Sequence, residues 1–171
     1  MRATNLPEEL PFGLVEAIEA AGVALSRRGG VWFASDVEMA YAIADTHDPV
    51  VSAKAAVLAD LAAYRYEREV GGMDFIGLRI DTSREARNNL TGAVVSAQLA
   101  TAAGQPFAVA WKGVDGTFAT LSASDLAALG VAVAAHVAEC FAREAGLGDT
   151  VNAMTSLDAV LGFDIAVAWA G

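Results

Sequence analysis

The sequence predicts an α+β fold, rich in helices, in which a small antiparallel sheet of hairpin strands packs against several helices. Three features of the 171 residues support this fold class. Apolar residues recur at helical spacing over several long stretches. Short stretches of strand-forming residues flank glycine-containing turns, as in β-hairpins. Capping residues and glycines mark where the helical stretches begin and end.

The first 71 residues are expected to form a separate helix–hairpin–helix unit. Residues 7–21 have apolar side chains at helical spacing. The stretches 23–26 and 31–34 then flank Arg27-Arg28-Gly29-Gly30, whose glycines can adopt the positive φ of a tight turn. This pattern predicts a hairpin with the two arginines at its tip.

Two further helices are predicted in this unit. Ser35 or Asp36 caps the first, which ends at Asp48-Pro49. The second covers residues 50–69, and the mixed charges at its end are expected to be solvated. Gly71-Gly72 follows, so we place a boundary there between a unit of residues 1–71, which could be an attachment module, and a domain of residues 72–171.

The domain of residues 72–171 begins with a predicted strand over residues 75–80. Thr82 and Glu85 have the spacing of a capping box, in which two side chains satisfy free backbone N–H groups at a helix start. A long helix is therefore expected to follow, with its end near Gly104.

A second hairpin and a long helix complete the predicted core of this domain. Segments 107–111 and 118–121 flank Asp115-Gly116, a common hairpin turn. Ser122 or Ser124 is expected to cap the helix that comes next. Gly146, with Gly148 close behind it, is expected to end that helix.

The chain ends on an apolar segment, although free termini are usually polar. Ser156 predicts a short helical turn, and residues 163–169 are expected to be strand-like. This segment is expected to pack back on the domain or against a neighbouring subunit. The candidate interface residues come from this segment and from the first hairpin: Trp169, Val167, Ile165, Phe163, Trp32, Arg27 and Arg28.

Composition and charge argue against several classes of function. The net charge of −10, from 21 acidic and 11 basic residues, is unlike that of proteins that bind nucleic-acid phosphates. A single cysteine, Cys140, excludes an internal disulfide and a CxxC metal site. Mean hydropathy is high at +0.42, yet the longest uncharged apolar stretch, 126–138, is shorter than the ~18 residues of a membrane span. The N-terminus has no signal-peptide pattern, so synthesis in the cytoplasm is expected.

Several short motifs follow one another in a recognisable order in residues 72–164. They are Ile80-Asp81-Thr82-Ser83, Trp111-Lys112 before Asp115-Gly116, Leu121-Ser122-Ala123-Ser124-Asp125-Leu126, His136 with Phe141, and Met154-Thr155-Ser156-Leu157-Asp158. In this order and spacing the chain resembles a domain-of-unknown-function family found in bacteriophage and prophage tail fibre and tail-associated proteins. The resemblance implies a role in the virion or in its assembly, and it supplies no catalytic residues.

The leading expectation is a non-enzymatic bacteriophage tail protein, structural or adaptor in role, with no catalytic residue, cofactor or metal. Its expected partners are other tail proteins and further copies of itself in a symmetric homo-oligomer, without nucleic acid and without membrane insertion. It would be made in the cytoplasm of the bacterial host and reside in the virion tail. The alternative is an assembly chaperone for a tail fibre, absent from the mature particle.

A small metal-dependent enzyme is the remaining alternative, centred on His136, Glu139 and Cys140. Residues three and four apart share a helix face, and these side-chain types bind metals. A lone histidine on an apolar helix is more often a packed core residue, however, and no second cluster supplies further ligands.

Other polar and aromatic groups also have a structural interpretation beside a functional one. Asp45, His47 and Asp48 could attract a divalent cation, but next to a proline they fit a helix boundary better. Asp81-Thr82 could hold a ligand at a helix start, although capping is favoured because the carboxylate repels anions.

The three tryptophans, Trp32, Trp111 and Trp169, could form a sugar-stacking surface. Half-buried packing is the more common role of tryptophan in an alternating strand. We therefore favour packing for the tryptophans, or a subunit contact for Trp169.

Overall fold

The structure is a computed structural model that describes residues 6–171. The chain divides into two compact units. The first combines the chain up to Asp60 with Asp149–Gly171, and the second is Leu61–Gly148. Both boundaries fall inside long helices, and the boundary predicted at Gly71-Gly72 lies within the second unit.

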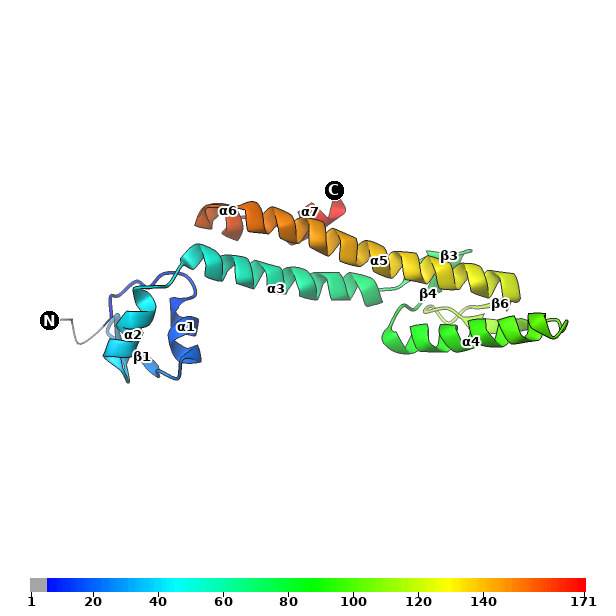
Figure 1. Ribbon diagram of the computed structural model, residues 1–171, viewed down its shortest axis with the longest axis horizontal. Coiled ribbons are helices and arrows are strands. Elements are labelled where there is room, and N and C mark those ends of the chain that lie inside the picture. The colour runs from blue at the N-terminus through cyan, green and yellow to red at the C-terminus, as the bar shows by residue number, and fades with distance from the viewer. Residues whose placement is uncertain (1–5) are drawn as a thin grey trace. The chain divides into compact units, whose positions relative to one another are not determined.

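The first unit is built on a hairpin and short helices. Helix α1 (Leu14–Ala20), strands β1 (Leu25–Arg28) and β2 (Val31–Ala34) and helix α2 (Val37–Ala44) come first (Figure 1). The start of α3 (Pro49–Val70), the end of α5 (Ala123–Ala153), α6 (Leu157–Leu161) and α7 (Ile165–Ala170) complete it. Its main apolar core consists of Leu6, Leu14, Ile18, Val23 and Ala40.

Side chains close in sequence cap the starts of several helices in this unit. The Asp36 carboxylate accepts a hydrogen bond from the Met39 N–H at 3.0 Å and caps α2. The Asp48 carboxylate accepts one from the Val50 N–H at 2.8 Å, and Pro49 occupies the first turn of α3, where its missing N–H costs nothing. Ser156 caps α6 as predicted. In the hairpin, Gly29 and Gly30 have φ of 57° and 86°, which gives the predicted tight turn.

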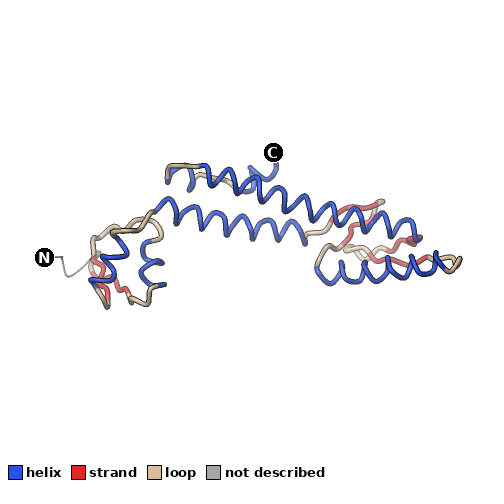
Figure 2. The backbone as a smooth tube through the Cα atoms, viewed as in Figure 1, coloured by secondary structure: helices blue, strands red, loops and turns tan. Residues whose placement is uncertain are grey.

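The second unit packs helices against two hairpins. It contains the end of α3, strands β3 (Met73–Phe75) and β4 (Leu78–Ile80), helix α4 (Arg84–Ala102), strands β5 (Ala108–Lys112) and β6 (Phe118–Ser122), and most of α5. Figure 2 shows the strands of this unit beside α4 and α5. Its core consists of Leu78, Ile80, Leu90, Ala97, Leu121, Leu126, Leu129 and Val133. The helix-rich α+β class is confirmed, although the described strands form three separate two-stranded sheets.

Four predicted elements were wrong in their bounds or type. The strand expected over 75–80 is the β3–β4 hairpin, which turns at Ile76 and Gly77. The first helix begins only at Leu14. Helix α5 continues through Gly146 to Ala153, because burial of Val151 offsets the low helix propensity of glycine. The terminal segment is the helix α7, which Asp164 caps, rather than a strand.

Helix α5 is also long and apolar enough, by length and composition alone, to cross a membrane. The sequence expectation considered only the uncharged stretch 126–138, whereas the helix extends well beyond it. The same helix supplies Leu126, Leu129 and Val133 to the core of the second unit, as core helices of this length and composition do. The absence of membrane insertion stays a prediction.

Candidate functional site

An apolar groove lies between α4 and α5 of the second unit. One hollow of about 520 Å³ lies among Leu90, Val94 and Val95 of α4 and Gly130, Ala134 and Val137 of α5. The two helices come close here, because a Cβ added to Gly130 would lie 3.5 Å from a methyl carbon of Val94. A small residue at this crossing therefore sets the floor of the groove.

A second hollow of about 670 Å³ extends the groove toward the end of α4. It is lined by Val94, Gln98 and Thr101 of α4 and by Ala123 and Ala127 of α5, among others. Val94 borders both hollows, so they form one groove along the seam between the helices. We call this surface, from Arg87 to Thr101 and from Ala123 to Ala138, the α4–α5 groove, whose charged residues Arg87 and Asp125 lie at its two ends.

The α4–α5 groove was missed by the sequence reasoning, yet the sequence contains a signal for it. The chain has no charged residue in 88–111 and none in 126–138. Most solvent-exposed helix faces in soluble proteins are rich in charge. Here Val95, Leu99 and Val131 are exposed instead, the last by 72%. Two uncharged helical stretches that each expose valine or leucine indicate a surface suited to another apolar surface.

A buried ion-pair cluster joins three helices in the same unit. Glu69, at the end of α3, is only 5% exposed. Its carboxylate accepts hydrogen bonds from Arg65 of α3 and from Arg87 of α4, the latter at 2.6 Å. The Nε of Arg65 also donates to Glu144 of α5 at 2.9 Å, and its guanidinium lies 4.4 Å from the ring centre of Phe141. Two positive and two negative charges therefore compensate one another.

The backbone around Glu69 is held by two further side chains. The Thr82 hydroxyl donates to the Glu69 carbonyl at 2.6 Å and accepts from the Gly72 N–H at 2.9 Å. The His136 Nε2 lies 3.3 Å from the same carbonyl, which fits donation from a protonated Nε2. Thr82 is completely buried, and its hydroxyl binds Glu69 and Gly72 instead of capping α4. The predicted capping box is therefore wrong, and Ser83 caps α4. The prediction that the charges at the end of α3 are solvated is wrong for Glu69.

The electrostatics of this cluster favour a structural cross-link over acid–base or nucleophilic chemistry. Burial raises the pKa of the Glu69 carboxyl, but the hydrogen bonds and charges of Arg87 and Arg65 outweigh burial and hold the pKa below its ordinary value. Burial, followed by the negative charges of Glu69 and Glu139, raises the pKa of the Cys140 thiol. Glu69 therefore stays ionised with its acceptor sites occupied, and Cys140 stays a protonated, weakly nucleophilic thiol.

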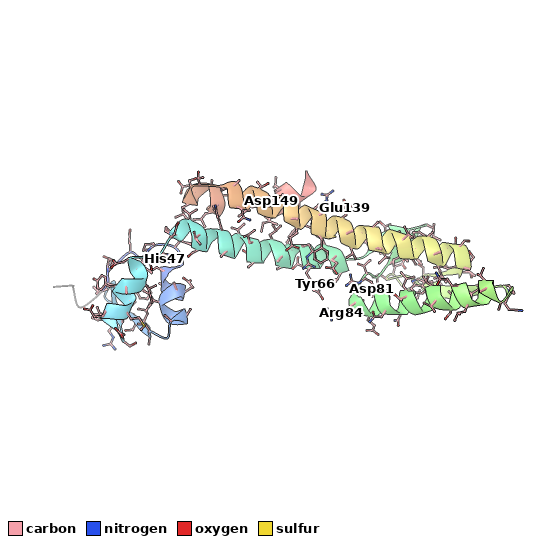
Figure 3. The ribbon with its side chains drawn as sticks, viewed as in Figure 1. His47, Tyr66, Asp81, Arg84, Glu139 and Asp149 are labelled. Carbon is pink, nitrogen blue, oxygen red and sulfur yellow. The ribbon has the colours of Figure 1, made fainter. Side chains whose placement is uncertain are left out.

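The alternative metal centre is not assembled by the fold. His136 faces the Glu69 carbonyl, whereas the Glu139 side chain is 64% exposed and pairs with Arg143 at 3.1 Å (Figure 3). Cys140 is buried. Within residues 6–171 no group of three or more His, Cys, Asp or Glu side chains is arranged to hold a metal ion.

His47, Asp48 and Asp81, also singled out in the sequence, have structural partners within their own units. The His47 ring nitrogen Nε2 lies 2.6 Å from the carbonyl oxygen of Phe12, within the first unit. Asp48 caps α3, as described above. Asp81 accepts hydrogen bonds from the N–H and hydroxyl of Ser83, at 2.7 and 3.1 Å, beside the start of α4 (Figure 3).

The predicted interface residues lie on the β1–β2 hairpin and on or just before α7, all in the first unit. Arg27 and Arg28 are exposed at the end of β1, and the Arg27 guanidinium lies 5.5 Å from the centre of the Trp32 ring. Trp32 packs partly against the core of this unit.

On α7 and just before it, Trp169 is buried, Phe163 and Ile165 are half-buried, and Val167 is 70% exposed. The structure thus places Val167, Arg27 and Arg28 where a partner could reach them. Trp111 packs partly against the core of the second unit, so packing accounts for all three tryptophans.

Comparison with known proteins gives one match. Residues 52–167 match the family described as Domain of unknown function (DUF4376). No curated protein and no solved structure is significantly similar to the chain. The match extends beyond residues 72–164, on which the sequence resemblance rests, and includes most of α3 with Glu69. Because it covers more than half of the sequence, the chain belongs to the DUF4376 family.

Proposed function

We propose that this chain is a bacteriophage tail protein, structural or adaptor in role, that is held in the particle by protein–protein contacts and catalyses no reaction. It would act as a homo-oligomer among other tail proteins, be made in the host cytoplasm and reside in the virion tail. The association with phage tails rests on the order of motifs in residues 72–164.

The observation that carries the structural role is the α4–α5 groove. Single exposed apolar residues are normal on a protein surface, whereas a continuous apolar groove marks a contact site. The groove runs along the uncharged parts of two long helices, with Val95, Leu99 and Val131 exposed beside it. Such a surface is better suited to packing against protein than to reaction with a polar substrate.

The buried ion-pair cluster supports the same role. The carboxylate of Glu69 forms ion pairs with Arg65 and Arg87. The side chains of His136 and Thr82 bind the backbone of α3. These contacts hold three helices in a fixed arrangement. A stable scaffold with an open apolar face suits a subunit that packs against copies of itself or against other tail proteins.

Quantitative mass spectrometry of purified particles, compared with the lysate of the cells that produce them, tests the proposal. We expect the chain in particles at a fixed ratio to the major tail protein. Abundance in the lysate with absence from particles would favour the assembly chaperone. Absence from particles, combined with normal particle yield when the gene is deleted, would refute both roles.

The metal-dependent alternative has its own test. We expect the alanine variants of His136, Glu139 and Cys140 to leave the metal content of the purified protein unchanged. Stoichiometric zinc or another transition metal in the wild-type protein, lost in these variants, would favour the enzyme instead.

A further inference from the structure

We infer that the α4–α5 groove is the surface on which a second copy of this chain packs. This inference rests on the proposed function of a repeated structural subunit, and it assigns the self-contact to one face. The two copies would meet with the same face, as in a two-fold symmetric dimer.

The charge distribution identifies the occupant as a second copy. The chain has a net charge of −10, so two copies repel each other wherever acidic surfaces approach. The face formed by 88–102 of α4 and 126–138 of α5 has no charge. Arg87, which lines one end of the groove, is paired with Glu69, and Asp125 near the other end accepts hydrogen bonds from Ser122. A copy bringing the same neutral face meets no unpaired like charge, whereas a basic partner would find here only the carboxylate of Asp125, which is already hydrogen-bonded.

The shape of the face provides both hollows and projections. The groove holds two hollows of about 520 and 670 Å³ in line. Val95 lines its α4 wall and is 48% exposed. Val131 lies four residues after Ala127 and three before Ala134, both of which line the groove, so it stands at the α5 rim. Valines on the rims of one copy would enter the hollows of the other, as ridges pack into grooves between helices.

The size of the face can be compared with that of a stable interface. The neutral stretches 88–102 of α4 and 126–138 of α5 give a face roughly 21 Å long and about 20 Å wide, or about 420 Å² in projection. Side-chain relief makes the accessible area larger than the projection. The face therefore supplies more than half of the ~800 Å² per partner that specific interfaces bury.

Sedimentation of the full-length chain over a range of concentrations tests the inference, with Val95→Glu as the first variant. We expect the wild type to have twice the monomer mass of 17.6 kDa. The variant should raise the dimer dissociation constant by about 100-fold or more, since each dimer would bury two unpaired carboxylates. Val95 is 48% exposed and glutamate favours helix over valine, so the monomer should keep its fold.

Three further variants make the result specific. Val131→Glu, on the opposite rim and 72% exposed, should dissociate the dimer as Val95→Glu does. Val51→Glu is the matched control, because Val51 is 61% exposed on α3 and lies in the first unit. Val167→Glu tests the competing surface on α7. Far-ultraviolet circular dichroism should show the same helix content in all four variants.

Several outcomes would overturn the inference. A wild type that stays at 17.6 kDa at every concentration has no such contact. A dimer that survives both Val95→Glu and Val131→Glu uses another face. A dimer that only Val167→Glu dissociates is formed through α7.

Failure of this inference and failure of the proposed function give different results. If the wild-type dimer depends on Val95 and Val131 but the chain is absent from particles, the inference holds and the tail role fails. If the chain is in particles and Val95→Glu is incorporated at the same ratio while remaining a dimer in solution, the tail role holds and the inference is refuted.

Discussion

Replacing Glu69 by glutamine should destabilise the second unit more than any exposed charge substitution in this chain. Glutamine keeps the size of the side chain but removes the negative charge between Arg65 and Arg87. The amide oxygen of glutamine can accept a hydrogen bond from one of the two guanidinium groups. Its NH₂ group, which is a donor, then faces the donor groups of the other guanidinium. Arg65 keeps Glu144 as a partner, whereas Arg87 loses the carboxylate at 2.6 Å.

The magnitude follows from burial and from the number of charged hydrogen bonds. Breaking a fully buried ion pair costs ~3–5 kcal/mol. The side chains of Arg65 and Arg87 are 16% and 26% exposed, so water compensates part of the loss. We expect Glu69→Gln to lower the free energy of unfolding by about 2–3 kcal/mol at neutral pH.

The stabilisation by Glu69 should also depend on pH in a defined direction. The pKa of its carboxyl is lowered in the folded state from an ordinary value of 4.5. A lowered pKa stabilises the fold fully above the unfolded-state value and loses this contribution as pH falls through the folded-state value. The difference in unfolding free energy between wild type and Glu69→Gln should therefore be constant near neutral pH and should shrink below about pH 4.5.

Urea unfolding followed by circular dichroism measures this difference across the pH range. Glu139→Gln is the matched control, because Glu139 also pairs with an arginine at helical spacing but is 64% exposed. The control should change stability by less than about 0.5 kcal/mol. Equal effects of the two glutamine variants, or a Glu69 effect that persists unchanged in acid, would refute the reasoning.

Four further effects can be measured, each on its own variant or side chain. Ile76→Asn should stabilise the β3–β4 hairpin by about 1 kcal/mol, because Ile76 is 64% exposed and has a φ of 44°, a conformation that asparagine adopts more readily than isoleucine. A urea midpoint at or below that of wild type would contradict this. Gly146→Ala should raise the melting temperature, because alanine favours helix over glycine by about 0.5–1 kcal/mol and the added methyl meets no atom within 4 Å. An unchanged or lower melting temperature would contradict this. Thr82→Val should lower the free energy of unfolding by about 1–3 kcal/mol, because it leaves the Gly72 N–H without its acceptor. A free energy of unfolding equal to that of wild type would show that this hydrogen bond is dispensable. The buried Cys140 thiol should react with a thiol-specific reagent far more slowly in the folded protein than in urea, and equal rates would show that the thiol is accessible.

Much of the secondary structure could be predicted because its signals are local. The Gly29-Gly30 and Asp115-Gly116 turns position their hairpins, and Asp36 and Ser156 cap their helices, through contacts within a few residues. At Thr82 a local signal failed because a distant contact replaced it. Thr82 has the spacing of a capping residue, but its hydroxyl is bound 13 positions away, at Glu69.

The candidate site could be predicted only in part. The uncharged stretches 88–111 and 126–138 are visible in the sequence, but a stretch without charge can equally be fully buried. Only the packing of α4 beside α5 shows that these stretches leave an open groove. The interface expected on α7 lay partly on buried positions, because helical geometry turns Trp169 inward and Val167 outward.

The sequence by itself determined the fold class, the Gly29-Gly30 and Asp115-Gly116 hairpin turns, most helix starts and the lack of charge in residues 88–111 and 126–138. These features depend on backbone propensities and on side chains that act on near neighbours. The tertiary structure decided that Glu69 is buried, that α5 continues through Gly146 and that the α4–α5 groove is uncovered. Each of these depends on residues far apart in the chain, such as Arg65 and Glu144, which are 79 positions apart. Burial and charge pairing are properties of such long-range packing, and they outweigh the local preferences of the residues involved.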